Sequence, residues 1–507
     1  MSRNIKSGIS KDEGRLKREK VSLSLRKEKR HEHLAKRRDE SLADLSTDAL
    51  TTQLQRLPEF VQKVFSDDLQ QQIEGTHGLR KLLSLEQPEP LTATIQANVI
   101  PRLVEFLRVP ENNLQFEAAW ALTNIASGSS EHTMAVVNAH AVPALIRTIG
   151  QPGKLNVKEQ CIWALGNIAG EGHDARNYIL NSGAMGVVVQ TVEQAIHEGN
   201  KSILKNIVWA LANLCRAKPL PEPHLIQPAI PLLVRLLSNP DHHVVGDAVW
   251  AFVYLSDSDN AEDIERVIQC GAVPKLLDLL TIDDAKVQTP ALRALGNILT
   301  GNDRQSDFVI DQGLLPRIKH IVVNGRPAVQ REAIWALSNV TAGSAHQITL
   351  CFSNGLMHPV IKLLTNASFE VRKEALWCVA NAIVSGTFEH CQQIINDGAH
   401  IPIIQLMSVA DTDCVSVALD AVLGLLKTGE KMANATGEVN PFKELIISFG
   451  GLEKIGDLQR HPDDKIYRKT THVLETYFME HVSEEQEDVV PEVVGETYQF
   501  QAGGFNL

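Results

Sequence analysis

The sequence is poor in aromatic residues and lacks long apolar runs. Aromatic residues make up 5% of the 507 residues, although apolar residues as a whole make up 44%. This composition favours helices rich in Leu, Ile, Val and Ala over a core built from aromatic rings. No apolar run approaches the ~18 residues of a membrane-spanning helix, and the N-terminus is too highly charged for a secretory signal peptide. We therefore expect a soluble protein that is not secreted.

Cysteine is scarce, and the motifs of the common enzyme classes are missing. The seven cysteines form neither a CxxC pair nor a Cys/His ligand pattern, so we interpret them as small buried residues in a reducing compartment. There is no P-loop, dinucleotide-binding glycine signature, HExxH or nucleophile elbow. The best fragment of a metal site, Asp241-His-His243, lies in a connecting turn without a third ligand in sequence. We expect no cofactor, no metal and no enzymatic activity.

Positive charge is concentrated at the beginning of the chain. The formal net charge is −12, but residues 1–40 hold fourteen basic and seven acidic side chains, so the other residues carry −19. Residues 1–50 have little apolar surface, and we expect them to be disordered or a frayed helix that forms on a partner. Two alternatives are a solubilising tail and a nucleic-acid-binding arm at residues 15–38, although the acidic body makes binding to nucleic acid unlikely on charge grounds.

One short motif, Trp-Ala-Leu-x-Asn and its variants, recurs along the chain at a nearly fixed interval. The steps between successive copies are 43, 46, 41, 43, 42 and 42 residues. The fourth copy replaces Asn with Tyr254, and the fifth replaces Trp with Arg293. A period of this size is typical of a helical solenoid. The copies begin at Trp120, Trp163, Trp209, Trp250, Arg293, Trp335 and Trp377.

A second landmark divides each repeat into helices. A turn such as Gly271-Ala-Val-Pro274 precedes each middle helix, because Gly ends one helix in the left-handed region and Pro opens the next. Each unit is predicted to hold a short helix, a middle helix such as residues 142–149 and a long third helix such as residues 157–169. Three helices in ~42 residues is the armadillo pattern.

The whole chain is therefore predicted to be an all-α, right-handed superhelical solenoid of about ten armadillo repeats at residues 51–480. The first repeat and the last two lack the Trp/Asn pair, as capping repeats would. The period lengthens only between residues 427 and 442. After residue 481 the chain is acidic, and residues 481–507 are expected to be a flexible tail without regular structure.

The Trp and Asn of each motif should stand on one face of the third helix, because residues i and i+4 lie one above the other. A buried apolar position gives no reason for an amide one turn later. We call the Trp and Asn of successive third helices the ladder. Packed helices lie ~8 to 10 Å apart and an extended peptide advances ~3.3 Å per residue, so each step of the ladder matches two to three residues of an extended ligand. An Asn amide can bind both the N–H and the C=O of a ligand backbone.

The spaces between neighbouring indoles suit the stem and cationic head of Lys or Arg. An acid stands one turn before five of the six tryptophans, Trp209 being the exception. Individually these acids could be ordinary solvated charges, but their recurrence favours a groove that recognises cations. The replacements at Tyr254 and Arg293 divide the row into a three-Trp site and a two-Trp site, which suits two basic clusters joined by a spacer. The acids are Glu117, Glu159, Asp247, Glu332 and Glu374.

These motifs resemble the importin-α (karyopherin-α) family, the adaptors for proteins with basic nuclear localisation signals. Trp120-Ala-Leu-Thr-Asn-Ile-Ala-Ser-Gly128 and Trp163-Ala-Leu-Gly-Asn-Ile-Ala-Gly170 look like the first two major-site repeats of the family, and Asn213-Leu-Cys-Arg216 looks like the third. The resemblance implies a basic importin-β-binding segment, ten armadillo repeats and an acidic tail. It leaves as the alternative an armadillo scaffold for adhesion or cytoskeletal partners, which would not need a detachable basic arm.

The resemblance also implies the site residues. A pocket for the key lysine of the ligand maps to Gly128, Thr133 and Glu171, where Glu171 replaces an Asp of the family and sets the carboxylate one methylene farther from the backbone. The major site maps to Glu117, Trp120, Asn124, Gly128, Thr133, Glu159, Trp163, Asn167, Glu171, Trp209, Asn213 and Asp247. The minor site maps to Asn297, Asp303, Glu332, Trp335, Asn339, Glu374, Trp377 and Asn381.

The basic cluster Lys36-Arg37-Arg38 looks like the autoinhibitory cluster of the family. The resemblance implies that this arm competes with cargo for the groove until importin-β binds it. It further implies that Ran-GTP releases cargo in the nucleus and that an export receptor with Ran-GTP returns the adaptor, which would shuttle between cytoplasm and nucleus. No membrane partner is expected.

Overall fold

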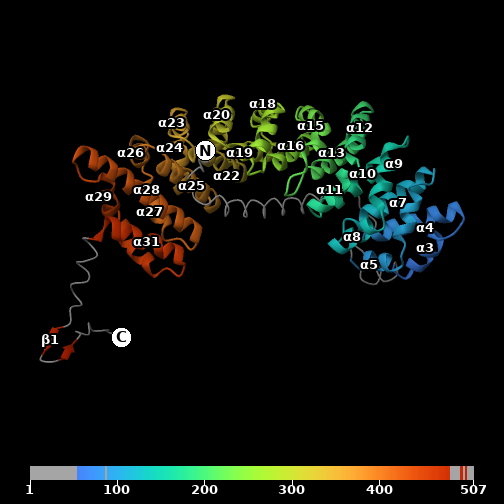
Figure 1. The fold of residues 1–507 in the computed structure, drawn as a ribbon, viewed down its shortest axis with the longest axis horizontal. Helices are drawn as coiled ribbons and strands as arrows, with labels where there is room; N and C mark the ends of the chain where they lie inside the picture. The colour runs from blue at the N-terminus through green and yellow to red at the C-terminus, as the bar shows by residue number, and fades with distance from the viewer. Residues whose placement is uncertain (1–53, 86–87, 480–491, 495–496, 500–507) are drawn as a thin grey trace. The chain divides into compact units, whose positions relative to one another are not determined.

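The computed structural model describes residues 54–85, 88–479, 492–494 and 497–499, and the predictions for residues 1–50 lie outside them. Most of these residues are helical, as the repeat pattern predicts. Within the described part, no helix is both long and apolar enough to span a membrane. The chain forms two compact units, one ending at Gly301 and the other beginning at Asn302. Figure 1 shows the helices of each unit following one another in chain order.

A long third helix forms the centre of each repeat, and successive third helices pack against each other within each unit. In residues 54–301 these helices are α4 (Leu69–Leu83), α7 (Asn112–Ile125), α10 (Leu155–Ala169), α13 (Lys201–Leu214), α16 (His242–Ser256) and α19 (Ala285–Leu299). In residues 302–479 they are α22 (Pro327–Thr341), α25 (Phe369–Ser385), α28 (Thr412–Thr436) and α31 (Asp464–Tyr477). The described residues thus contain ten third helices, in agreement with the ten predicted repeats.

The shorter helices precede each third helix. The first helix of the described residues is α3 (Leu57–Val64), which packs on α4. The first helices of the following repeats are α5 (Pro88–Gln96), α8 (Ser130–Asn138), α11 (His173–Asn181), α14 (Pro223–Ile226), α17 (Ala261–Gln269), α20 (Asp303–Asp311), α23 (Ala345–Ser353), α26 (Phe388–Asn396) and α29 (Pro441–Ser448). The middle helices are α6 (Ile100–Phe106), α9 (Ala141–Gly150), α12 (Ala184–His197), α15 (Ile230–Leu236), α18 (Ala272–Leu279), α21 (Leu314–Asn324), α24 (Met357–Asn366), α27 (His400–Leu406) and α30 (Gly451–Asp457). The 3₁₀ turns η2 (Gln227–Ala229) and η3 (Leu458–Arg460) complete two of the repeats.

The turns before the middle helices have the predicted backbone conformation. Gly271 and Gly313 precede α18 and α21 with φ of 79° and 91°, the left-handed region that costs glycine least. The same turn is made without glycine before α6 and α9, where Asn98 and His140 take φ of 52° and 56°. The shape of the repeat therefore imposes this conformation even on residues with a Cβ.

The insertion predicted at residues 427–442 is mostly helical. It lengthens α28 to 25 residues, well beyond the other third helices. Gly437 ends the helix with φ of 75°, and the Asn440 Nδ2 then donates to the Leu426 carbonyl at 2.8 Å. The extra residues thus extend one helix and fold back onto it before α29 begins.

Two short strands lie in the C-terminal segment, where the sequence predicted no regular structure. Strands β1 (Glu492–Val494) and β2 (Thr497–Gln499) pair antiparallel, with Val493 opposite Tyr498. This pairing could not be predicted from the sequence, because the strands follow an acidic run and each has only three residues in which polar and apolar side chains could alternate. The all-α prediction therefore applies to the repeats.

The cysteines are packed in the repeats as the sequence predicts. All seven are free thiols, and only Cys270 is half-exposed. Burial raises the pKa of both Cys215 and Cys378 to about 12, so these thiols stay protonated at neutral pH. They act as small apolar side chains in the core.

Candidate peptide-binding site

The predicted ladder residues stand on successive third helices. In residues 54–301, α7, α10 and α13 carry Trp120, Trp163 and Trp209. Trp163 is only 3% exposed, while Trp120 and Trp209 are half-buried. The Trp163 and Trp209 rings meet edge to face with centroids 6.1 Å apart. These two indoles therefore contact each other directly, so a ligand side chain would lie along their exposed edges or separate them.

Five of the Asn side chains bind the preceding repeat. In each case the side-chain Nδ2 donates to a backbone carbonyl one repeat earlier. The bonds run from Asn124 to the Arg80 carbonyl (3.3 Å), from Asn167 to Thr123 (3.1 Å), from Asn213 to Gly166 (3.3 Å), from Asn297 to Val253 (3.0 Å) and from Asn381 to Ser338 (3.0 Å).

These bonds give the Asn amide a structural role, whereas the sequence pattern predicted only a role in binding a ligand. Each accepting carbonyl lies in the last turn of a third helix, where backbone C=O groups have fewer partners in their own helix. The carbonyls of Arg80, Gly166 and Ser338 also accept from a backbone N–H just after their helix, so the Asn supplies a second donor there. A carbonyl can only accept a hydrogen bond, so the amide must present its NH2 group to it. The Asn side chain therefore caps the previous third helix. Its oxygen is left to bind other groups, and the Asn381 Oδ1 is a buried acceptor without a donor among the described residues.

The acids one turn before the tryptophans are largely satisfied within the chain. Glu159 accepts from the Asn206 Nδ2 at 2.5 Å, and Glu332 accepts from the Arg331 Nη2 at 3.2 Å. Asp247 is buried, and Glu374 is half-buried. Because their charges lie below the surface, these acids would act on a ligand cation through the field they create rather than as exposed carboxylates.

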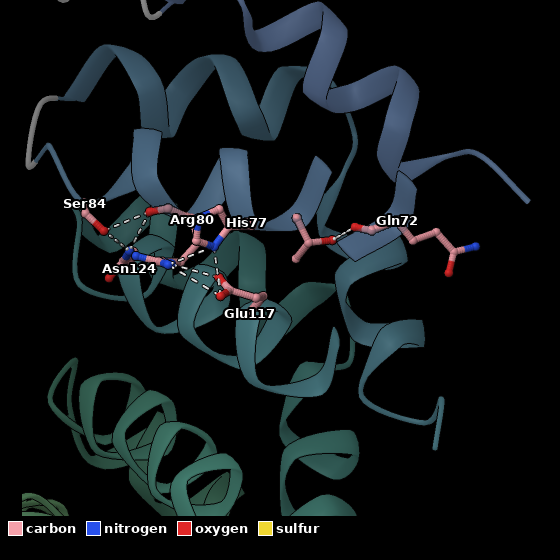
Figure 2. A network of polar contacts seen from close by, with 7 residues as sticks. Gln72, His77, Arg80, Ser84, Glu117 and Asn124 are labelled. Atoms are coloured by element: carbon pink, nitrogen blue, oxygen red, sulfur yellow. Dashed lines mark hydrogen bonds and ion pairs between the residues drawn. The ribbon is translucent and has the colours of Figure 1, made fainter. Parts of the chain in front are cut away.

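Glu117 belongs to a compact polar cluster at the start of the ladder. Arg80 on α4 donates from Nε to the Glu117 Oε2 at 2.8 Å, and the His77 Nδ1 lies 3.0 Å from the Glu117 Oε1. Figure 2 shows these side chains converging from α4 and α7, with Ser84 and Asn124 beside them. The Arg80 guanidinium also lies over the Trp120 ring, 4.2 Å from its centroid. The sequence analysis missed Arg80, because the first repeat lacks the motif.

At the other end of this unit, an arginine also lies against a ladder tryptophan. The Arg293 guanidinium on α19 is 5.7 Å from the centroid of Trp250 on α16. Arg293 is buried, and the Tyr254 ring, one turn after Trp250 on the same helix, packs with its centroid 5.8 Å from that of the indole. Tyr254 and Arg293, which replace the Asn of one motif and the Trp of the next, therefore pack against the Trp250 indole in place of a ligand.

Two of the three residues predicted for the lysine pocket come together in the structure. Thr133 on α8 and Glu171, just after α10, have 3.2 Å between the Thr133 Oγ1 and the Glu171 Oε1. Gly128 lies in the turn after α7, where an added Cβ would come within 2.4 Å of the His132 Nδ1. Only glycine therefore fits at position 128 without displacing His132. Glu171 is half-exposed, whereas Thr133 is buried.

The predicted minor-site residues are divided between the two units. In residues 302–479, Glu332 and Trp335 stand on α22, and Glu374 and Trp377 stand on the adjacent α25. Trp335 is buried, whereas Trp377 is half-buried. The remaining predicted residues are Asn297 on α19, Asp303 at the start of α20, Asn339 on α22 and Asn381 on α25.

The Asp241-His-His243 fragment has a structural explanation. Asp241 caps α16 by accepting from the His243 backbone N–H at 3.0 Å, and it pairs with Lys205 at 2.8 Å. His242 instead lies 2.8 Å from Asp284 on the next repeat. In the part of the chain that the structure describes, no group of three or more His, Cys, Asp or Glu side chains could hold a metal ion.

These features define a class of protein: an armadillo solenoid whose third helices present rows of indole, amide and acid side chains. The family model "Importin beta binding domain" matches residues 3–77, so the match extends beyond the predicted N-terminal segment into α4. Models of the armadillo/beta-catenin-like repeat match residues 87–127, 129–170, 260–300 and 302–342, a HEAT-like repeat matches residues 202–255 and an atypical Arm repeat matches residues 440–492.

Similar proteins identify the family. Importin subunit alpha-B of Dictyostelium discoideum is 48% identical over 99% of this chain and 98% of its own length. Importin subunit alpha-3 of Arabidopsis thaliana is 41% identical over 95% of this chain and 92% of its own length. A crystal structure of an engineered protein matches with a TM-score of 0.72 and 26% identity, covering 83% of this chain and 98% of its own. The chain belongs to the importin-α family.

The family settles the broad function. The chain is a nuclear import adaptor that binds cargo carrying basic nuclear localisation signals and links it to importin-β. The predicted identity of the N-terminal segment as an importin-β-binding segment is confirmed, and the alternatives of an enzyme and of a scaffold for unrelated partners are set aside. The residues that bind cargo are not identified by these comparisons.

Proposed function

We propose that the third helices of residues 54–301 hold the main basic cluster of a cargo signal as an extended chain. The supporting observation is the lysine pocket, where the half-exposed Glu171 has its carboxylate 3.2 Å from the hydroxyl of the buried Thr133. The Glu171 carboxylate would pair with a lysine ammonium, and the Thr133 hydroxyl would hold that carboxylate in place by donating to it. Asn167 and Asn213 each donate one N–H to the previous helix, so the side-chain oxygen and the second N–H of each remain for the ligand backbone.

The test is the binding of a fluorescent lysine-rich peptide to Glu171→Gln, measured by anisotropy. Loss of a charge-assisted contact of about 1.5 to 3 kcal/mol should weaken binding by roughly ten- to a hundredfold. The matched control is Glu131→Gln, which removes the same charge from an exposed position on α8. Equal affinity of Glu171→Gln and the unchanged protein would remove the pocket from the binding site.

We also propose that Lys36-Arg37-Arg38 competes with cargo for this site and that importin-β removes the competitor. A cluster on a tether of some tens of residues has an effective concentration of order millimolar. By linkage, cargo must then raise the affinity for importin-β by the factor by which importin-β raises the affinity for cargo. We further propose that Ran-GTP releases the cargo in the nucleus and that an export receptor returns the adaptor, which would shuttle between the compartments, as the family resemblance implies.

The full-length chain with Lys36→Ala, Arg37→Ala and Arg38→Ala tests the competition. It should bind the signal peptide more tightly than the unchanged chain, and addition of importin-β should no longer increase its affinity. If the two chains bind the peptide equally and respond equally to importin-β, the basic cluster is not a competitor.

A further inference from the structure

The first repeat has a different set of side chains at the ladder positions. One repeat before Trp120, α4 carries His77 in place of a tryptophan, and Arg80 follows on the same helix. Arg80 is 9% exposed although it carries a full charge. Burying a cation is costly unless it is paired and hydrogen-bonded, so the surroundings of Arg80 must compensate for its loss of water.

Three contacts provide that compensation. The guanidinium lies 4.2 Å from the Trp120 ring centroid, its Nε donates to the Glu117 Oε2 at 2.8 Å, and its Nη2 lies 3.4 Å from the Glu117 Oε1. The Nη2 also lies 3.0 Å from the His77 Nδ1. An indole face and a carboxylate one turn earlier are the same pair of groups that the sequence pattern predicts for a cation of the ligand.

We propose that Arg80 is an internal substitute for a ligand cation, which fills the face of Trp120 turned toward α4 and thereby ends the row of cation-binding positions. This inference rests on the proposed peptide-binding function. Arg80 is then a specificity-determining residue: it limits how many consecutive basic residues of a ligand bind. A ligand lysine placed beyond Trp120 would meet an indole and a carboxylate that Arg80 already contacts. The positive charge of Arg80 would also repel the lysine.

The opposite end of the same unit supports this interpretation. Arg293 lies over Trp250 at 5.7 Å and is also buried. The two arginines thus rest on the first and the last ladder tryptophans of residues 54–301. An arginine of the chain therefore stands against an indole at each end of the row, where a ligand would enter or leave it.

Removal of Arg80 should therefore add a binding position. In Arg80→Ala, the face of Trp120 becomes accessible and Glu117 loses its strongest partner, so a new indole and carboxylate pair is created. Arg80→Met provides the contrast, because its long apolar side chain can still cover the indole while the positive charge is gone. Both changes remove the same charge, and only Ala opens the face.

The experiment compares two fluorescent peptides on the full-length protein: a short lysine cluster and the same cluster with one added lysine at either end. In the unchanged protein, the lysine added toward α4 should improve binding less than about twofold. In Arg80→Ala it should improve binding about three- to tenfold, in line with a cation–π contact and a freed carboxylate. Arg80→Met should behave like the unchanged protein.

A control and the contrary outcomes complete the test. Arg102 on α6 lies 4.8 Å from the Phe106 ring and 2.7 Å from Glu105, so Arg102→Ala removes a similar arginine that is not on a third helix, and it should change neither peptide. Thermal unfolding followed by circular dichroism checks that each variant folds. Equal gains in Arg80→Ala and Arg80→Met, or no gain in a folded Arg80→Ala that still binds the short peptide, would overturn the inference. If the unchanged protein does not bind the short peptide, the proposed function itself fails.

Discussion

At the scale of single residues, the Asn side chains of the ladder do two jobs. The Asn167 Nδ2 caps α7 through the Thr123 carbonyl at 3.1 Å, and its remaining amide atoms can contact a ligand. A substitution at such a position therefore changes stability and affinity together. Weakened peptide binding by itself cannot identify a ligand contact here, since the position also joins two repeats.

Asn167→Ala should lower the free energy of unfolding by about 1 to 2 kcal/mol, because the Thr123 carbonyl loses its donor. Asn167→Asp should be worse, because a carboxylate oxygen would then face a carbonyl oxygen. Urea unfolding followed by circular dichroism measures both. Asn156→Ala is the control, because this exposed Asn of α10 accepts from the adjacent Val157 N–H of its own repeat. Stability equal to that of the control would show that the bond to Thr123 contributes nothing.

The sequence predicted which side chains make up the site but not which of them are already occupied. The repeat interval places Trp120, Trp163 and Trp209 on one row, because the period and the helical spacing fix the face. The interval carries no information about Arg80, which lies outside the motif and reaches Trp120 only after α4 packs on α7. The roles of donor and acceptor at each Asn likewise depend on the neighbouring helix end, which a single repeat does not reveal.

At the scale of the helix, the capping residue sets a sensitivity to pH. The Ser344 and Asn302 caps of α23 and α20 use Gln347 and Gln305 as the reciprocal partner, whereas α26 uses His390. The His390 Nδ1 accepts from the Thr387 backbone N–H at 3.1 Å, and its ring stacks on Phe352. A protonated Nδ1 cannot accept this bond. Burial lowers the pKa of His390, in spite of the nearby Glu389 charge, which raises it.

We predict that His390→Gln makes stability less dependent on pH. Because the pKa of His390 is lower in the folded chain, the unfolded chain binds more protons as pH falls below about 6.5, and the folded state loses stability there. A glutamine side chain at this position would keep the acceptor at all pH values, since its amide does not titrate. The unfolding midpoints measured at about pH 7.5 and about pH 5 should differ less in His390→Gln than in the unchanged protein. If the difference between the two midpoints is the same in both proteins, His390 does not set the pH dependence of the cap.

The helix boundaries were largely predictable from sequence, because a recognisable turn separates the helices within each repeat. The expected third helix at residues 157–169 is Leu155–Ala169, and the expected middle helix at residues 142–149 is Ala141–Gly150. The extension of α28 was predicted only as an insertion, since a longer period does not tell whether the extra residues are helical. Gly429 inside this helix lies where a Cβ would meet the Asn440 side chain at 2.0 Å, so it admits the returning segment.

At the scale of the whole molecule, the two rows of tryptophans predict different dependence on ligand length. Trp209 and Trp377 are both half-buried and each stands on a third helix, so their truncation to Ala removes similar groups. Trp209→Ala should weaken single-cluster and two-cluster peptides alike, whereas Trp377→Ala should weaken only the two-cluster peptide. A lost cation–π contact of ~0.5 to 2 kcal/mol corresponds to about two- to thirtyfold in affinity.

Titration by isothermal calorimetry with both peptides measures this difference. Peptides of equal length and charge, one with its basic residues in a single block and one with two separated blocks, keep the nonspecific attraction to the acidic body constant. If Trp377→Ala weakens the single-block peptide as much as Trp209→Ala does, the division into a larger and a smaller site is wrong.

The Asn bonds between repeats also determine where this chain could be cut. The Thr123 carbonyl of α7 accepts from Asn167, and the Gly166 carbonyl of α10 accepts from Asn213 as well as from the Gly170 N–H. A fragment that stops at the end of a repeat therefore loses a side-chain hydrogen bond to the final turn of its last third helix, even though every helix of that repeat is present. A usable boundary in this solenoid lies beyond the Asn of the following repeat, so the modules of the protein overlap along the sequence.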